Sequence, residues 1–305
     1  MPAAEDHLQP MSASGRAHEL RQRLSEGLLI GDGGMGTYLH GEGAPLGECL
    51  ELLNIERPEL VCAAHRAFLD AGSEVIQTNT FQGNAVSLSR HGLAQRTAEL
   101  DRAGAALARE VAGERAYVAG SIGPTGNILQ PYGDMPENLA RQSFSEQAWA
   151  LAEGGVDFFI LETFFALEEI RLAIAAASQA GLPIVAGMAF DTGGRTSFGI
   201  SPERAAAQLG ASGATVVGAN CGTISPGEMV EIIGRFRQAT ALPLFAQPNA
   251  GRPQQTPAGV VYPETPESLA DAAARFRALG ASLIGGCDGT TPAHIRAIAA
   301  RLRGG

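Results

Sequence analysis

The stretch VDFFILETFFALEEIRLAIAAASQAGLPIVAGM, residues 156–188, decides the fold of this chain. It opens with an apolar run at 156–161, continues with a segment of helical periodicity at 167–180, and closes with a second apolar run at 183–188. Short apolar runs of this kind predict buried strands, whereas the longer periodic segment predicts a helix. Gly181 stands where a left-handed residue typically ends a helix. The stretch is therefore predicted to form a parallel strand–helix–strand unit.

The same alternation runs along the whole chain. Predicted strands occupy 27–30, 73–77, 117–120, 156–161, 183–188, 214–219, 242–246 and 282–284. Predicted helices occupy 58–71, 93–112, 137–154, 167–180, 201–212, 225–240, 265–279 and 291–302. The last four helices begin with Ser-Pro or Thr-Pro. This pair is typical of helix starts, since the hydroxyl caps the first turn and proline suits the first helical position.

Eight strand–helix units close a barrel better than they fill an open sheet. The predicted fold class is therefore α/β, a (β/α)8 TIM barrel in a single domain. A chain of 305 residues suits one such barrel, and no linker or low-complexity segment divides it. We predict that residues 21–305 form the barrel domain and that residues 1–20 form a flexible N-terminal tail.

Composition narrows the class of protein. The net charge of −10 disfavours nucleic acid and anionic membrane surfaces as partners. No apolar run approaches the roughly 20 residues that cross a bilayer, and the N-terminus lacks the apolar region of a signal peptide. The four cysteines are spread along the chain instead of forming a disulfide pattern. These features predict a cytoplasmic enzyme that binds neither nucleic acid nor membranes.

Glycine-rich and polar motifs follow the predicted strands. They are Gly-Asp-Gly-Gly-Met-Gly-Thr at 31–37, Gln-Thr-Asn-Thr-Phe at 77–81, Gly-Ser-Ile-Gly-Pro-Thr-Gly at 120–126, Glu-Thr-Phe at 162–164, Ala-Asn-Cys-Gly at 219–222, Gln-Pro-Asn-Ala-Gly at 247–251 and Gly-Gly-Cys-Asp-Gly-Thr at 285–290. Active sites of (β/α)8 barrels lie at the C-terminal ends of the strands. The motifs are therefore predicted to meet at one end of the barrel.

Two of these motifs carry cysteines. Cys221 follows the sixth predicted strand and Cys287 the eighth, so strands of equal parity can bring the two thiols into one layer. Thiolates at strand ends without a neighbouring Cys-x-x-Cys pair suggest a zinc site with an open coordination position. Asp288, beside Cys287, is either a third ligand or a turn or cap residue. The alternative for each cysteine is a small core residue.

The order of these motifs resembles the homocysteine S-methyltransferase family, over nearly the whole chain. Gly-Pro-Thr-Gly at 123–126 and Pro-Asn-Ala-Gly at 248–251 are most similar to the homocysteine-binding module of cobalamin-dependent methionine synthase. The resemblance implies a zinc-activated thiol that accepts a methyl group. It also implies zinc ligands at Cys221, Cys287 and position 288. This chain departs from the family there, because Asp288 replaces the second of two adjacent cysteines.

The resemblance implies methyl transfer to homocysteine or a similar small thiol, giving methionine. Cys221, Cys287 and Glu162 are the predicted catalytic residues. An amino acid substrate also needs a carboxylate for its ammonium, for which Asp32 and Glu162 are suitable, and donors for its carboxylate, such as the amides near Gly33. The full set of predicted substrate-binding residues is Asp32, Gly33, Thr78, Asn79, Ser121, Glu162 and Asn220.

The methyl donor is left open by the sequence. Methylcobalamin on a separate corrinoid protein, S-methylmethionine and betaine are the candidates. Two other functions are also open. One is a barrel lyase or hydrolase with Asp32, Glu162 and Asp288 as acid–base groups, which needs no zinc thiolates. The other is a non-catalytic amino acid-binding relative with an altered metal site.

Overall fold

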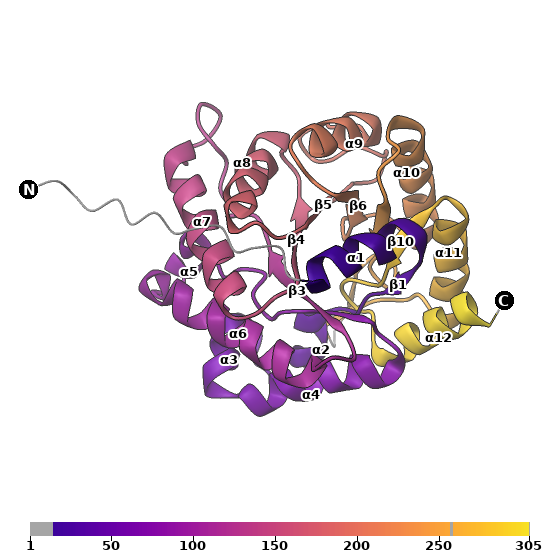
Figure 1. The fold of residues 1–305 in the computed structure, drawn as a ribbon, viewed down its shortest axis with the longest axis horizontal. Coiled ribbons are helices and arrows are strands. Elements are labelled where there is room, and N and C mark those ends of the chain that lie inside the picture. Colours follow the sequence, from indigo (N-terminus) through magenta and orange to yellow (C-terminus); the bar gives the residue numbers. More distant parts are fainter. Residues whose placement is uncertain (1–14, 257–258, 305) are drawn as a thin grey trace, which may run out of the picture.

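The computed structural model describes residues 15–256 and 259–304. Eight parallel strands form one sheet in the order β1-β10-β7-β6-β5-β4-β3-β2, which curls into a barrel (Figure 1). The strands are β1 (Leu29–Ile30), β2 (Val75–Gln77), β3 (Tyr117–Ile122), β4 (Phe158–Phe164), β5 (Ile184–Met188), β6 (Val216–Asn220), β7 (Leu244–Gln247) and β10 (Ala281–Ile284). The Glu74 amide donates to the Ile30 carbonyl at 2.7 Å, which brings the two edge strands together. The prediction of a (β/α)8 barrel is confirmed.

Within the described residues, eight helices surround the strands. They are α4 (Pro58–Ala71), α6 (Thr97–Ala112), α7 (Glu137–Glu153), α8 (Leu167–Ala177), α9 (Pro202–Ala211), α10 (Pro226–Ala239), α11 (Pro266–Ala278) and α12 (Pro292–Arg303). The hydroxyls of Ser201, Ser225 and Thr265 accept backbone N–H bonds from the first turns of α9, α10 and α11, as the Ser-Pro and Thr-Pro pairs predict.

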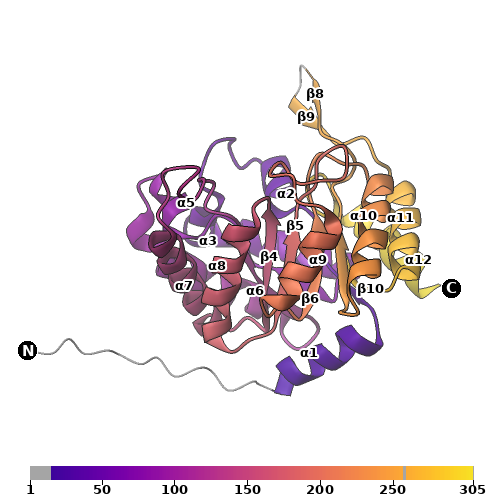
Figure 2. The ribbon, with the colours of Figure 1, turned by 90° about the horizontal axis from the view of Figure 1, so that it is seen from above.

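Helix α1 (Gly15–Glu26) corrects the boundary predicted at residue 20. The helix lies across the end of the barrel where the strands begin (Figure 2). Leu20 and Leu24 are buried there and pack with Leu29 and Val75 in the lower barrel core. Residues 15–20 thus belong to a packed helix, because two leucines one turn apart give it an apolar face. Residues 1–14 of the predicted tail lie outside the described residues.

Shorter elements stand at the opposite end of the barrel, where the strands end. After β1 come α2 (Met35–Gly41), the 3-10 turn η1 (Leu50–Leu52) and α3 (Leu53–Glu56), and α5 (Ala85–Ser89) follows β2. After β7 the chain forms a hairpin of β8 (Gln254–Thr256) and β9 (Gly259–Val261), which projects beyond the barrel (Figure 2). Within the described residues, no helix has the length and apolar character needed to cross a membrane.

Candidate metal centre and substrate pocket

A pocket of about 380 Å³ lies where the strands end. Eight of the residues predicted to form the site line it: Gly33, Thr78, Asn79, Ser121, Glu162, Cys221, Cys287 and Asp288. They come from β1, β2, β3, β4, β6 and β10 or from the segments directly after these strands. The barrel topology therefore collects residues that are more than 250 positions apart in the sequence.

Three potential metal ligands converge in this pocket. One sulfur each from Cys221 and Cys287 and one carboxylate oxygen of Asp288 all lie within 4.8 Å of one another. The Cys221 thiol donates to the Asp288 carboxylate at 3.8 Å between Sγ and Oδ2. The expected convergence of β6 and β10 is thus present in the structure, with the carboxylate beside the two thiols.

The loop after β7 holds the backbone that carries Cys287 and Asp288. The Cys287 amide donates to the Pro248 carbonyl at 2.8 Å, and the Asp288 amide donates to the Asn249 side chain at 3.1 Å. The Ala250 amide returns a hydrogen bond to the Asp288 carbonyl at 2.9 Å. These three bonds fix the turn, so the Cys287 and Asp288 side chains leave it in a defined direction.

Cys221 stands in a backbone conformation that side chains rarely adopt. Its φ is +54°, and Gly222 follows with φ of +83°. A Cβ on Gly222 would lie 2.1 Å from the Phe190 carbonyl oxygen, so only glycine fits between the loops after β5 and β6. Strained residues of this kind persist where the surrounding structure holds them, and they cluster at functional sites.

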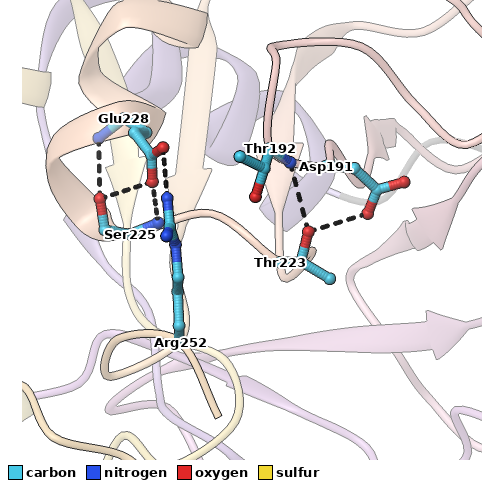
Figure 3. A network of polar contacts seen from close by, with 6 residues as sticks. All are labelled: Asp191, Thr192, Thr223, Ser225, Glu228 and Arg252. Carbon is cyan, nitrogen blue, oxygen red and sulfur yellow. Dashed lines mark hydrogen bonds and ion pairs between the residues drawn. The ribbon is translucent and has the colours of Figure 1, made fainter.

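Polar contacts on both sides hold the loop that follows Cys221 (Figure 3). On one side, the Thr223 hydroxyl donates to Asp191 and accepts from the Thr192 amide, both in the loop after β5. On the other side, Ser225 and Glu228 form a capping box at the start of α10, and Arg252 from the loop after β7 pairs with Glu228. Three consecutive strand-end loops are thereby linked around the candidate metal centre.

Glu162 is directed into the pocket by an irregularity in β4. The register between β4 and β5 shifts between Leu161 and Phe164, and Thr163 has a φ of +62°. The Ser121 hydroxyl donates to Glu162 Oε1 at 2.6 Å. Burial raises the pKa of Glu162 to about 7; the Ser121 hydrogen bond lowers it, and nearby negative charges raise it. The carboxyl therefore changes its protonation state near neutral pH.

Asn220 lies behind the pocket lining and holds this irregularity in place. Its Oδ1 accepts from the Thr163 amide at 2.8 Å, and its Nδ2 donates to the Thr163 hydroxyl at 2.7 Å. The same Nδ2 lies 3.3 Å from Glu162 Oε2. All its polar atoms are used within the chain, so the structure gives Asn220 a supporting position beneath the pocket.

Asp32 is also below the lining, with 1% of its surface exposed. Its two carboxylate oxygens accept from the backbone and side-chain N–H groups of Gln77, at 2.7 and 2.9 Å. Burial raises the pKa of Asp32 to about 7, partly offset by these hydrogen bonds. Asp32 therefore supports the base of the pocket and, unlike Glu162, does not line it.

Two other predicted substrate contacts have partners inside the chain. The Thr78 hydroxyl lies 2.6 Å from that of Thr80, and the side-chain amide of Asn79 donates to the Leu50 carbonyl at 2.7 Å. Asn79 thus fixes the loop after β1 over the pocket. Sequence reasoning missed that loop: His40, Glu48, Cys49 and Glu51 line the pocket, although no motif or spacing marks them.

The donor set suits a divalent cation. Hydrogen bonding with Cys221, burial, and the negative charges of Cys221, Asp288 and Glu162 raise the pKa of the Cys287 thiol well above its ordinary value. Two thiolates and a carboxylate at this separation repel one another, and a dication offsets that repulsion. Two sulfurs and one oxygen also form an acceptable zinc ligand set that leaves one position open.

Comparison with known proteins identifies the family. The profile of the homocysteine S-methyltransferase family matches residues 29–302, which include every strand and helix of the barrel except the tip of α12. The chain belongs to the homocysteine S-methyltransferase family. The predicted family resemblance is confirmed.

The curated relatives of this homocysteine S-methyltransferase family member include methionine synthases. That of Mycobacterium tuberculosis is 35% identical over 99% of this chain, and that of Mycobacterium leprae is 34% identical over 93%. The chain spans about a quarter of their length, 26% and 25%. Among solved structures, the metallated homocysteine methyltransferase MmuM of Escherichia coli is similar with a TM-score of 0.77 and 26% identity, over 92% of this chain and 99% of that one.

Proposed function

We propose that this protein is a zinc-dependent S-methyltransferase that methylates the thiol of homocysteine, giving methionine. The observation that carries the proposal is the convergence of Cys221, Cys287 and Asp288 within 4.8 Å at the pocket. The family match and the metallated relative from Escherichia coli support it. They also favour methyl transfer over the lyase or hydrolase and the non-catalytic alternatives.

Cys221, Cys287 and Asp288 would hold the zinc ion, leaving the fourth position for the substrate sulfur. A free thiol has a pKa of about 8.5 and is mostly protonated at neutral pH. Bound zinc would supply the positive charge that deprotonates it. Asp288 keeps the total ligand charge of a three-cysteine site. Because a carboxylate donates less electron density than a thiolate, we expect a more acidic metal and a less nucleophilic substrate sulfur than three cysteines would give.

The remaining residues bind the amino acid part of the substrate. The described lining carries four carboxylates, on Glu48, Glu51, Glu162 and Asp288, and neither Arg nor Lys. Glu162 is best placed for the substrate ammonium, because that cation stabilises its ionised form and offsets the cost of burial. Gly33 and the first turn of α2 offer backbone N–H groups for the substrate carboxylate. Asp32 and Asn220 lie below the lining and position it through hydrogen bonds with Gln77 and Thr163.

The candidate methyl donors differ in how they would reach the pocket. A methyl-corrinoid on a separate protein would have to dock over the pocket, whereas S-methylmethionine or betaine would enter it directly. Transfer of a deuterated methyl group to homocysteine, followed by mass spectrometry with each donor, separates these routes. The cytoplasmic location stays a prediction.

The test of the proposed function combines metal analysis with turnover. Protein purified without added metal should contain zinc and form labelled methionine with one of the donors. Cys287→Ser should lose both zinc and turnover, whereas Cys62→Ser, a buried thiol on α4, should keep both. Turnover of another substrate that survives chelators and thiol reagents would favour the lyase or hydrolase. Homocysteine binding without turnover with any donor would favour the non-catalytic relative.

A further inference from the structure

Tyr262 lies beside the candidate metal centre, although it comes from the segment directly after the β8–β9 hairpin. Its ring packs on Gly289, directly after Asp288: a Cβ on Gly289 would lie 2.2 Å from Tyr262 Cγ. Tyr262 is half-buried, whereas its neighbours Val260 and Val261 are 54% and 43% exposed. The hairpin therefore turns one aromatic side chain inward at its end.

Both ends of the hairpin are fixed to the barrel. At the start, Arg252 pairs with Glu228 of α10 (Figure 3). At the end, the Glu264 amide donates to the Ala250 carbonyl at 3.0 Å, and the Glu264 carbonyl lies 3.0 Å from the His294 ring nitrogen. Because these contacts flank Tyr262 on both sides, its ring has a defined place over the turn at 288–289.

The ring packs on the turn that carries Asp288 and does not line the pocket. Tyr262 does not line the pocket, which Cys221, Cys287 and Asp288 do. Burial raises the pKa of Tyr262, and the negative charges of Asp288, Cys221 and Cys287 raise it further, so the phenol stays protonated at neutral pH. The ring therefore covers the backbone directly after Asp288, two residues along the chain from Cys287.

We propose that Tyr262 is a positioning residue of this centre. Its ring shields Cys221 and Cys287 on the side away from the pocket and holds the Asp288–Gly289 turn in place. Excluding water strengthens the attraction between a cation and its anionic ligands and slows attack on them by solutes. The part of this inference that concerns zinc rests on the proposed function, whereas the shielding of the two thiols does not.

The first experiment measures thiol access in metal-free, folded protein. Iodoacetamide alkylation of each cysteine is followed by mass spectrometry in wild type, Tyr262→Ala, Tyr262→Phe and the matched hairpin control Val261→Ala. We expect several-fold faster alkylation of Cys221 and Cys287 in Tyr262→Ala alone. Cys49 and Cys62, both 7% exposed, are internal controls that should not change. If each of the four cysteines is alkylated at the same rate in Tyr262→Ala as in wild type, the proposal is overturned. A faster rate at all four cysteines in the variant would overturn it as well.

The second experiment measures zinc release from loaded protein into a chromogenic chelator. Tyr262→Ala should release zinc about tenfold faster or more, because the loss of a residue that supports metal ligands typically weakens metal binding by that much. Tyr262→Phe should stay close to wild type, because the proposal assigns the effect to the ring. Unchanged release in Tyr262→Ala, or equally fast release from Tyr262→Phe, would overturn it. Protein that never holds zinc would refute the proposed function, and the alkylation rates would still decide the role of the ring.

Discussion

Replacing Asp32 by asparagine should make the metal-free protein more stable at alkaline pH. Burial raises the pKa of this carboxyl from 3.8 to about 7. A carboxyl with a raised folded-state pKa contributes full stability below its unfolded pKa and loses it as the pH rises through the folded value. The window is therefore pH 3.8 to 7, and above it the buried negative charge destabilises the fold.

The magnitude follows from the shift. A shift of about three pKa units, at 1.36 kcal/mol each, means that the buried Asp32 carboxylate lowers the free energy of unfolding by roughly 4 kcal/mol above pH 7.5. At pH 4.5 this cost falls to about 1 kcal/mol. The side chain introduced by Asp32→Asn can keep the hydrogen bonds, because Gln77 Oε1 has no partner in the described structure and can rotate to accept from the new amide. The gain is substantial beside a typical total stability of about 5–15 kcal/mol.

Urea unfolding of both proteins at pH 8 and pH 4.5 measures the difference, provided the denaturant slope is unchanged. Asp134→Asn, at an exposed aspartate, is the control and should change stability little at either pH. An Asp32→Asn variant that is less stable than wild type at pH 8 would refute the reasoning. So would a difference that is the same at the two pH values, because a buried charge could not then be its cause.

Three further predictions follow from individual residues. Burial lowers the pKa of His65 to about 4 and neither ring nitrogen has a partner in the described structure, so the contribution of this side chain to stability should fall by about 3 kcal/mol between pH 6.5 and 4. The stability of His65→Leu relative to wild type, measured by urea unfolding, should therefore rise by that amount over this range, and a constant difference would contradict it. Asp288→Cys should bind zinc more tightly than wild type and Asp288→Ala more weakly in chelator competition, whereas equal constants would show that this carboxylate is no ligand. Gly222→Ala should destabilise the protein by at least about 2 kcal/mol more than Gly213→Ala, since both glycines have positive φ and only Gly222 faces a backbone atom; equal losses in urea unfolding would contradict this contact.

The sequence predicts the barrel well because each unit is local. The apolar run and the periodic helical segment of each unit lie within about forty residues, and the last four helices also have a Ser-Pro or Thr-Pro start. Barrel geometry then places the motifs at one end. This reasoning brings Cys221, Cys287 and Asp288 together correctly. It could not separate residues that line the pocket from those behind it, because Asp32, Glu162 and Asn220 all follow a predicted strand within two residues.

Hydrophobic periodicity and motif spacing do not predict contacts between segments that are far apart in the sequence. The segment from 40 to 51 closes over the pocket because the Asn79 side chain binds the Leu50 carbonyl, and no periodicity encodes that pairing. Tyr262 reaches Gly289 only through a hairpin that is fixed at both ends. The positive φ of Thr163 is likewise set by its neighbours, here the Asn220 side chain.

Zinc K-edge X-ray absorption of the purified protein, before and after homocysteine is added, tests whether Cys221, Cys287 and Asp288 bind a zinc ion that takes the substrate thiol as its fourth ligand. Before addition we expect two sulfur ligands at about 2.3 Å together with lighter oxygen or nitrogen ligands, and afterwards one additional sulfur. Zinc bound without sulfur ligands, or a sulfur count that homocysteine leaves unchanged, would contradict it.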